Sequence, residues 1–465
     1  MKDLGKDIYG VQRTMRRWDY FGDSLGQFAN NAMGGLVGQL TYFYTDKAGV
    51  AAASVATVLM LCKIIDAFTD LIMGNILDHT KPGKEKFRPW ILKAGIPSAI
   101  TLILLFTVPK VGDIGQIAYV FITNILFTSI FLTAFGVPYG SLQIVRTNSQ
   151  EERGRMGTWR AASGYVSGMI MAVAIIPITN LLGGTQSAWI KFAVISSAVI
   201  ILALLICYKT SREVPVGEEI SEEQARGQKD EVPFKVAVVN LFKNKYWVML
   251  LIMNFFVNIL YGLSNSSGAY YAKWIYGDDN LMGIMGAAGL IPTFIGFALV
   301  GVMVKHLGVV KTLKVSFVIG FASNILKIIN PYNFIYNLIL GLFGTFANIP
   351  MMCLMGVLLA MAVDYNEYKY GDKMVGCSAS ASNFGCKVGS GIGASIIGWC
   401  LGIAGYDATL AVAPMTTQQA IFTFSIYIPM IMFVILFIMA CKFDLEKKIP
   451  QIREEIKKRD VQNKR

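Results

Sequence analysis

The chain has 465 residues, of which 54% are hydrophobic and only 15% are charged. A soluble domain carries about 25% charged residues, so this composition excludes an ordinary soluble protein and indicates a membrane protein. The net charge of +12 does not indicate nucleic-acid binding, because the basic residues cluster in short segments between apolar runs. Two histidines and seven scattered cysteines leave little material for a His-based metal or catalytic site.

Apolar runs long enough to cross a bilayer recur along the whole chain, since a spanning helix needs roughly 20 apolar residues. Twelve runs qualify: 24–44, 50–77, 90–109, 116–140, 160–182, 188–208, 246–272, 282–304, 312–330, 334–362, 378–402 and 417–441. Lys and Arg concentrate in alternate connections, which is the positive-inside pattern and places both termini in the cytoplasm. We therefore expect an all-α, multi-pass protein of the cell (inner) membrane, embedded in the lipid bilayer.

A long polar stretch divides the spans into six and six. Two six-helix halves are typical of major-facilitator transporters, and "GNILDHTKPGK" at the end of span two weakly echoes "GVMVKHLGVVK" at the end of span eight. The predicted organisation is an N-terminal six-helix bundle (1–208), a cytoplasmic linker (209–245), a C-terminal six-helix bundle (246–441) and a cytoplasmic tail (442–465).

The linker itself allows two interpretations. Ser221 and Gln224 resemble a capping box and would start a short surface helix. A disordered linker explains the same composition.

The second span places three charges in an apolar run, "KIIDAFTDLIMGNILD". Asp66 and Asp70 are four residues apart and share a helix face, and Lys63 lies one turn earlier. A charge at the bilayer centre costs on the order of 2.5–3.5 kcal/mol, so this face must look into the bundle or a water-filled cavity. Two carboxylates suit a small hard cation or a proton, and Lys63 neutralises only one of them. We expect a site for a coupling cation; a structural ion pair is the alternative.

Polar and aromatic side chains in other spans are candidates for substrate binding, with packing as the alternative for each. Thr133 offers a hydroxyl near the membrane core in span four. Arg160 opens span five and could hold a sugar hydroxyl or a carboxylate. The further candidates include Gln27, Asn30, Asn31 and Gln39 in span one, Tyr139 in span four, Asn254, Asn258 and Asn265 in span seven, and Asn383 in span eleven.

Span eleven contains a second intramembrane charge, Lys387, which needs an anion. The carboxylates of span two are the obvious partners, so we expect a triad in which a bound cation displaces the lysine. A static ion pair is the alternative. Gly389 and Gly393 follow in GxxxG spacing, which favours close helix packing.

The acidic residues Asp364 and Glu367 in "DYNEYKYG" end span ten at the cytoplasmic face. They are either solvated loop charges or a cytoplasmic gate that pairs with basic residues of another loop.

Six segments together resemble one family. "WDYFGDSLGQFANN", "YFYTDKAG", "DAFTDLIMGNILDHTKPGKEKFRPW", "VPYGSL", "DYNEYKYG" and "NFGCKVGS" occur in order and cover nearly the whole chain. They are similar to motifs of the glycoside–pentoside–hexuronide:cation symporters, the melibiose permease family, with a closer likeness to the glucuronide permease branch.

The resemblance implies roles for several residues. The family's cation-site aspartates fall on Asp66 and Asp70, and the residue between them that is Asn in melibiose permease is Thr69 here. The remaining matches are the helix-four threonine on Thr133, the helix-eleven lysine on Lys387, the helix-five arginine on Arg160 and the basic residue before the first aspartate on Lys63.

The chain departs from the family at the galactoside-binding positions. The helix-four aspartate and its neighbouring tryptophan align with Gly136 and Gly140, and the helix-one sugar aspartate aligns near Asn30. The resemblance thus implies a retained cation site without the galactoside clamp. A hexuronide would suit Arg160 and Lys387, and Thr69 leaves the choice between sodium and protons open.

We expect a cation-coupled (sodium or proton) symporter of a sugar, glycoside, pentoside or hexuronide, working by alternating access as a monomer and without another cofactor. The runner-up is a cation-coupled carrier of amphipathic lipids or drugs. Two other classes of membrane protein fit the sequence less well. A membrane enzyme requires a cluster of catalytic side chains at the membrane surface, and a receptor requires a signalling domain larger than the tail 442–465.

Overall fold

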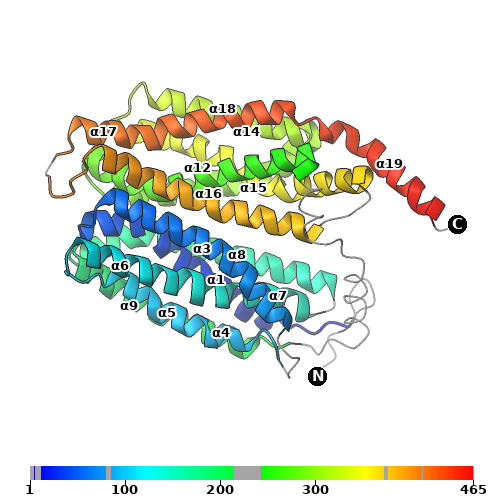
Figure 1. Cartoon of the computed structure of the whole chain (residues 1–465), viewed down its shortest axis with the longest axis horizontal. Helices are drawn as coiled ribbons and strands as arrows, with labels where there is room; N and C mark the ends of the chain where they lie inside the picture. Colours follow the sequence, from blue (N-terminus) through cyan, green and yellow to red (C-terminus); the bar gives the residue numbers. More distant parts are fainter. Residues whose placement is uncertain are drawn as a thin grey trace. The chain divides into compact units, whose positions relative to one another are not determined.

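The protein is described from a computed structural model that covers residues 5, 12–79, 85–147, 149–213, 242–370, 375–410 and 412–463. Every regular element in these ranges is a helix, and the chain runs through them as drawn in Figure 1. The prediction of an all-α fold is confirmed. The central part of the predicted linker, with Ser221 and Gln224, lies outside the described residues.

The described first half of the chain folds into helices, and two wider π-helical segments, η1 and η2, occur among them. They are α1 (Arg17–Gly38), α2 (Leu40–Tyr42), η1 (Phe43–Lys47), α3 (Ala52–His79), α4 (Pro89–Lys93), α5 (Gly95–Phe106), α6 (Asp113–Asn124), η2 (Ile125–Leu132), α7 (Thr133–Val145), α8 (Gln150–Leu181) and α9 (Gln186–Thr210).

The second half repeats this plan and adds a helix in the tail. Its elements are α12 (Lys245–Tyr271), η3 (Ala272–Tyr276), α13 (Leu281–Leu307), α14 (Val309–Lys327), α15 (Phe334–Tyr370), α16 (Val375–Ile403), α17 (Met415–Phe422), η4 (Thr423–Tyr427), α18 (Ile428–Lys442) and α19 (Leu445–Asn463).

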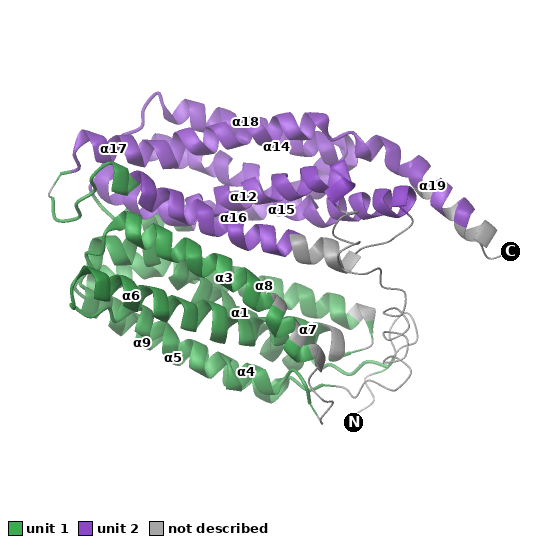
Figure 2. Ribbon diagram, in the orientation of Figure 1, with its two compact units in different colours: residues 1–223, 278–286, 401–412 green, residues 224–277, 287–400, 413–465 purple. Residues whose placement is uncertain are grey.

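Two compact units result, coloured separately in Figure 2. Unit 1 comprises residues 1–223, 278–286 and 401–412, and unit 2 comprises 224–277, 287–400 and 413–465. The two short segments of unit 1 from the second half of the chain fall within the predicted C-terminal bundle. The first of them, residues 278–286, packs directly against α8. A Cβ added at Gly283 would lie 3.0 Å from the Val173 oxygen, and one added at Gly286 would lie 2.9 Å from the Ala172 oxygen.

A capping arrangement is common to both halves. In unit 1 the Glu213 carboxylate, just after α9, accepts hydrogen bonds from the backbone N–H groups of residues 86–88 at 2.6–2.8 Å, where α4 begins. In unit 2 the Glu446 carboxylate, after α18, accepts from those of residues 309–310 at 2.6 and 2.9 Å, where α14 begins. A carboxylate that follows the last span of each half thus satisfies the orphan donors at the start of a middle span. This supports the duplication suggested by the sequence.

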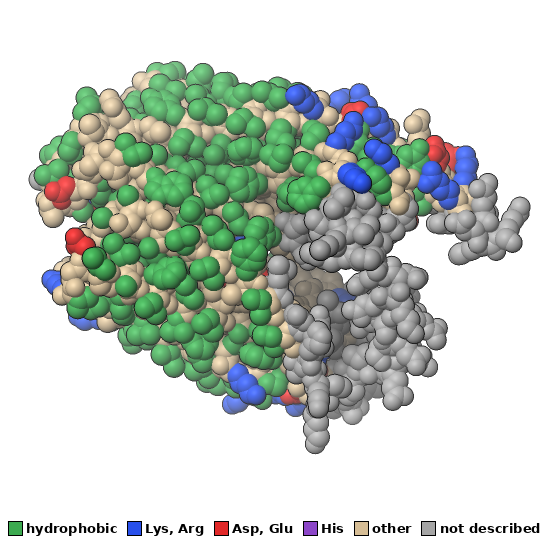
Figure 3. All heavy atoms as spheres, in the orientation of Figure 1, with side chains coloured by type: hydrophobic (Ala, Val, Ile, Leu, Met, Phe, Trp, Pro, Cys, Tyr) green, Lys and Arg blue, Asp and Glu red, His purple; other side chains and the backbone are tan. Residues whose placement is uncertain are grey.

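Ten stretches of the described residues are long and apolar enough to cross a membrane, and they match ten of the twelve predicted spans. The other two predicted spans, 24–44 and 50–77, form α1 to η1 and α3. Exposed apolar side chains such as Ile72, Ile122 and Ile195 lie on the helix surfaces. Hydrophobic side chains cover most of the face seen in Figure 3. An apolar surface of this extent is typical of contact with lipid.

Candidate functional site

The three charges of span two lie together on α3. The Asp66 side chain is buried, and Asp70 is half-buried on the same face one turn later. Lys63 Nζ lies 4.0 Å from Asp66 Oδ2, so the two side chains form a long ion pair. Lys63 thus pairs with Asp66, which is the contact of the structural alternative, and the role of the two carboxylates as a cation site stays a prediction.

Helix α7 brings a hydroxyl to these carboxylates. Thr133 Oγ1 lies 3.0 Å from Asp66 Oδ1 and 3.1 Å from Asp70 Oδ1. It also lies 3.2 Å from the backbone oxygen of Thr128, at the π-helical turn that leads into α7. One hydroxyl proton can serve only one of these three acceptors at a time. The result is an oxygen-rich cluster with an excess of lone pairs, the kind of donor set that suits a hard cation or a shared proton.

Thr69 is on the same helix but makes a different contact. Its Oγ1 donates to the backbone oxygen of Asp66 at 3.0 Å, within α3. The structure therefore brings Asp66, Asp70 and Thr133 together directly, with Thr69 beside them.

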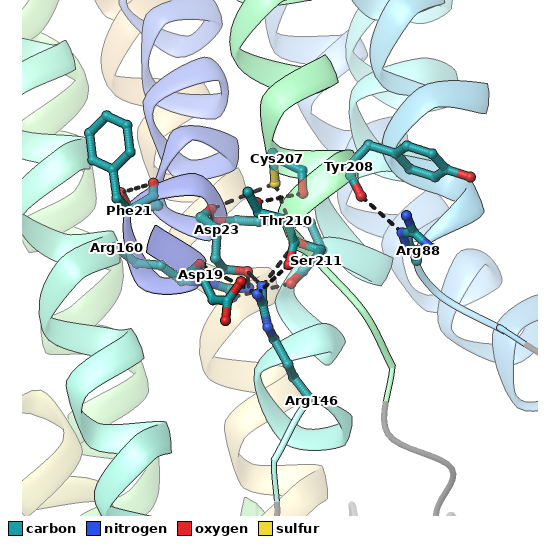
Figure 4. Close-up of polar contacts among 12 residues, drawn as sticks. Asp19, Phe21, Asp23, Arg88, Arg146, Arg160, Cys207, Tyr208, Thr210 and Ser211 are labelled. Atoms are coloured by element: carbon teal, nitrogen blue, oxygen red, sulfur yellow. Dashed lines mark hydrogen bonds and ion pairs between the residues drawn. The ribbon is translucent and has the colours of Figure 1, made fainter. Parts of the chain in front are cut away.

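Arg160 lies in a separate, deeply buried network around Asp23 (Figure 4), to which Tyr139 also belongs. Arg160 Nε and Nη2 donate to the two carboxylate oxygens of Asp23 at 2.6 and 3.0 Å, and Nη1 donates to the Tyr139 backbone oxygen at 3.1 Å. The Tyr139 hydroxyl donates to the Asp23 backbone oxygen at 2.8 Å, and the guanidinium lies over its ring at 4.0 Å. Each guanidinium nitrogen of Arg160 thus has a partner inside the protein.

A second arginine completes this buried ion cluster. Arg146 Nη1 donates to Asp23 Oδ1 at 3.1 Å and to Ser211 Oγ at 3.0 Å, and its Nη2 donates to the Thr210 backbone oxygen at 2.6 Å. The cluster joins α1, α7, α8 and the end of α9 around one carboxylate. The sequence prediction did not single out Asp23. The available signal was an acidic residue close to the start of the first span, with arginines elsewhere to match it.

Asn30, the predicted substrate ligand in span one, is half-buried on α1. Within the described part of the structure its side chain makes no hydrogen bond to another residue. It lies on the same helix as Asp23, two turns further along.

The remaining predicted residues belong to unit 2. Lys387 is half-buried on α16, and Asn383, one turn earlier, is exposed. Asp364 and Glu367 are half-buried on α15, which continues to Tyr370, so they belong to a helix and not to a loop. The proposed triad of Lys387 with the carboxylates of unit 1 stays a prediction.

The GxxxG packing prediction is confirmed. A Cβ added at Gly389 or Gly393 would lie 2.7 Å from the Phe255 oxygen or 2.3 Å from the Ile259 oxygen of α12, and one added at Gly262 would lie 2.4 Å from the Ser390 oxygen. Only glycine permits this approach of the two backbones.

Comparisons with known proteins agree with this architecture. Residues 22–447 match the family described as MFS/sugar transport protein. The chain is 26% identical to an isoprimeverose transporter of Lactiplantibacillus pentosus, over 97% of this chain and 94% of the relative. It is 28% identical to a glucuronide carrier protein homolog of Escherichia coli (strain K12), over 84% of this chain and 85% of the relative.

Solved structures show the same fold at low sequence identity. A D-xylose-proton symporter superposes with a TM-score of 0.64 at 12% identity, covering 92% of this chain and 98% of the symporter. The nucleoside transporter NupG gives a TM-score of 0.62 at 12% identity, covering 92% of this chain and 99% of the transporter. The chain belongs to the MFS/sugar transport protein family, and it is a carrier and not an enzyme.

Proposed function

We propose that the protein is a cation-coupled symporter of a sugar or glycoside that works by alternating access. The observation that carries this proposal is the oxygen cluster of Asp66, Asp70 and Thr133 inside the helices of unit 1. The names of relatives support it, since they include an isoprimeverose transporter and a putative glycoside/cation symporter.

The chemistry of the cluster accounts for coupling. The two carboxylates of the cluster exceed the single charge of Lys63, whose Nζ lies 4.0 Å from Asp66 Oδ2, so a further positive charge must balance the cluster in a poorly hydrated place. A bound Na⁺ or proton neutralises it, and Thr133 then turns a lone pair toward the ion. The conformational change becomes favourable for the loaded carrier and unfavourable for the half-loaded one. We infer that Lys387 supplies the neutralising charge when the site is empty.

The test is sugar uptake into vesicles under an imposed sodium or proton gradient, with isoprimeverose and methyl glucuronide as probes. Asp70→Asn abolishes gradient-driven accumulation in this proposal, whereas Asp113→Asn, which removes an exposed carboxylate of the same unit, leaves it unchanged. Normal accumulation by Asp70→Asn would refute the cation site. For Lys387→Ala we expect loss of accumulation with facilitated diffusion retained.

We also infer insertion into the inner membrane with both termini in the cytoplasm, and action as a monomer. The alternation of basic loops supports the orientation. A C-terminal green fluorescent protein fusion should fluoresce, while a C-terminal alkaline phosphatase fusion should be inactive. Light scattering of the purified protein should give the mass of one chain, 51.1 kDa.

A further inference from the structure

Basic side chains gather in unit 2 where α14 begins and where α18 is followed by α19. Lys311 lies in the first turn of α14, Lys442 ends α18, and Lys447 lies in the first turn of α19. All three residues, which we call the lysine cluster, are exposed. Figure 3 shows Lys and Arg side chains around the start of α19, next to the hydrophobic side chains that cover the helices of unit 2.

One carboxylate holds these helix ends together. The Glu446 carboxylate of α19 accepts hydrogen bonds from the backbone N–H groups of residues 309–310 at 2.6 and 2.9 Å. Lys311 follows these residues directly, and Lys447 follows Glu446 directly, so both lysines extend from backbone that lies at this contact. Lys442 lies four residues before Glu446, at the end of α18, which packs against α14. The fold therefore brings three lysines from three helices to one place.

The acidic residues next to the lysine cluster already have other partners. Glu446 caps α14 through both of its oxygens. Asp444 accepts hydrogen bonds from the Tyr246 hydroxyl at 2.6 Å and from Lys448 Nζ at 2.5 Å. Among the residues that the structure describes, the three ammonium groups of the lysine cluster have no hydrogen-bond or ion-pair partner. The cluster therefore presents positive charge that the neighbouring carboxylates do not balance.

The lysine cluster lies at the end of an exposed apolar surface. On α14, Val315 is 41% exposed and lies four residues after Lys311, on the same helix face. On α18, Ile438 is 48% exposed and lies four residues before Lys442, again on the same face. Because α14 packs against α18, the two apolar faces end at the same lysines. A lysine in this position can lay its aliphatic stem along apolar surface and hold its ammonium group at the polar edge.

We propose that the lysine cluster binds the headgroup phosphate of an anionic phospholipid, whose acyl chains lie on the apolar faces of α14 and α18. Basic sites between membrane helices recognise anionic headgroups in this way. A lipid fits better than a free phosphate ion, because the lysine cluster continues directly into the apolar surface that acyl chains cover. The lysines supply the positive charge by themselves, since Glu446 already occupies the first N–H groups of α14. This site is separate from the cation cluster and from sugar transport.

The experiment follows thermal unfolding of the full-length protein in detergent while phosphatidylglycerol is added. Phosphatidylcholine with the same acyl chains and inorganic phosphate are the comparison probes. A lipid that binds the folded protein raises the unfolding midpoint as its concentration rises. Phosphatidylglycerol should do so at a lower concentration than phosphatidylcholine, and inorganic phosphate should leave the midpoint unchanged.

Variants of the lysine cluster test the assignment. Lys311→Gln and Lys442→Gln should each weaken the apparent affinity for phosphatidylglycerol about fivefold, and the double variant about 25-fold. Lys110→Gln is the control, because it removes an exposed lysine from the loop between α5 and α6, and it should bind like the unmodified protein. Without lipid all these variants should unfold at the midpoint of the unmodified protein, since the ammonium groups that they remove make no contact with the described residues.

Four results would overturn the inference. Equal stabilisation by the two lipids would show that headgroup charge is not recognised. Equal affinity for phosphatidylglycerol in the double variant and in Lys110→Gln would place lipid binding elsewhere. Stabilisation by inorganic phosphate to the same extent as by phosphatidylglycerol would identify a site for a soluble anion. A lowered midpoint of the double variant without lipid, combined with unchanged lipid affinity, would give the lysines a structural role only. The measurement uses neither sugar nor an ion gradient, so its outcome does not depend on the proposed function.

Discussion

Removing the charge of Asp23 should destabilise the protein strongly. Asp23 is fully buried and binds two buried guanidinium groups, with contacts of 2.6 and 3.0 Å to Arg160 and 3.1 Å to Arg146. Asp23→Asn keeps the shape of the side chain but leaves two buried cations without an anion. Breaking a buried pair in this way costs about 3–5 kcal/mol. For a unit of about 240 residues that corresponds to a fall of about 6–20 °C in the unfolding midpoint.

The assay is thermal unfolding of the purified protein in detergent, followed by intrinsic fluorescence. Glu454→Gln is the control, because it removes a carboxylate from an ion pair with Lys458 in which both side chains are 68% exposed. That pair contributes little, so the control should unfold like the unmodified protein. The double variant Asp23→Asn, Arg160→Gln should recover part of the loss, since it removes a buried cation together with the anion. If Asp23→Asn unfolds at the same temperature as Glu454→Gln, the cluster is not the structural element described here.

Three further outcomes follow from other contacts. Thr133→Ala should weaken cation binding at least tenfold, because loss of even an outer-shell partner of a metal ligand lowers metal affinity about 10–100-fold. Thr133→Ser should restore the affinity. Equal cation-dependent thermal shifts in both variants would contradict this prediction. Gly393→Ala places a Cβ 2.3 Å from the Ile259 oxygen and should cost about 1–3 kcal/mol in unfolding free energy, whereas Gly301→Ala, with open space at its Cβ, should cost nothing. Glu446→Ala removes the cap of α14 and should cost about 1 kcal/mol, measured by denaturant unfolding; an unchanged midpoint would show that water replaces the cap.

The sequence by itself determined the membrane class, the helical fold and the shared helix face of Asp66 and Asp70. Apolar runs of spanning length must form helices in lipid, because every backbone donor and acceptor has to be satisfied within the segment. Asp66 and Asp70 could be placed on one helix face by spacing alone. The free-energy cost of a charge in contact with lipid indicated that this face lies inside the helix bundle. Gly389 and Gly393 likewise predicted close packing from their spacing.

Only the tertiary structure decided how the other polar residues are used. From the sequence, Arg160 was a candidate for binding a sugar. Its contact with Asp23, 137 residues away along the chain, depends on how α1 packs against α8. The same packing sets the hydrogen-bonded side chains of Gln27 and Asn31 against Gly164. Local spacing fixes which residues share a helix face, but the partner that this face meets is a property of the folded bundle.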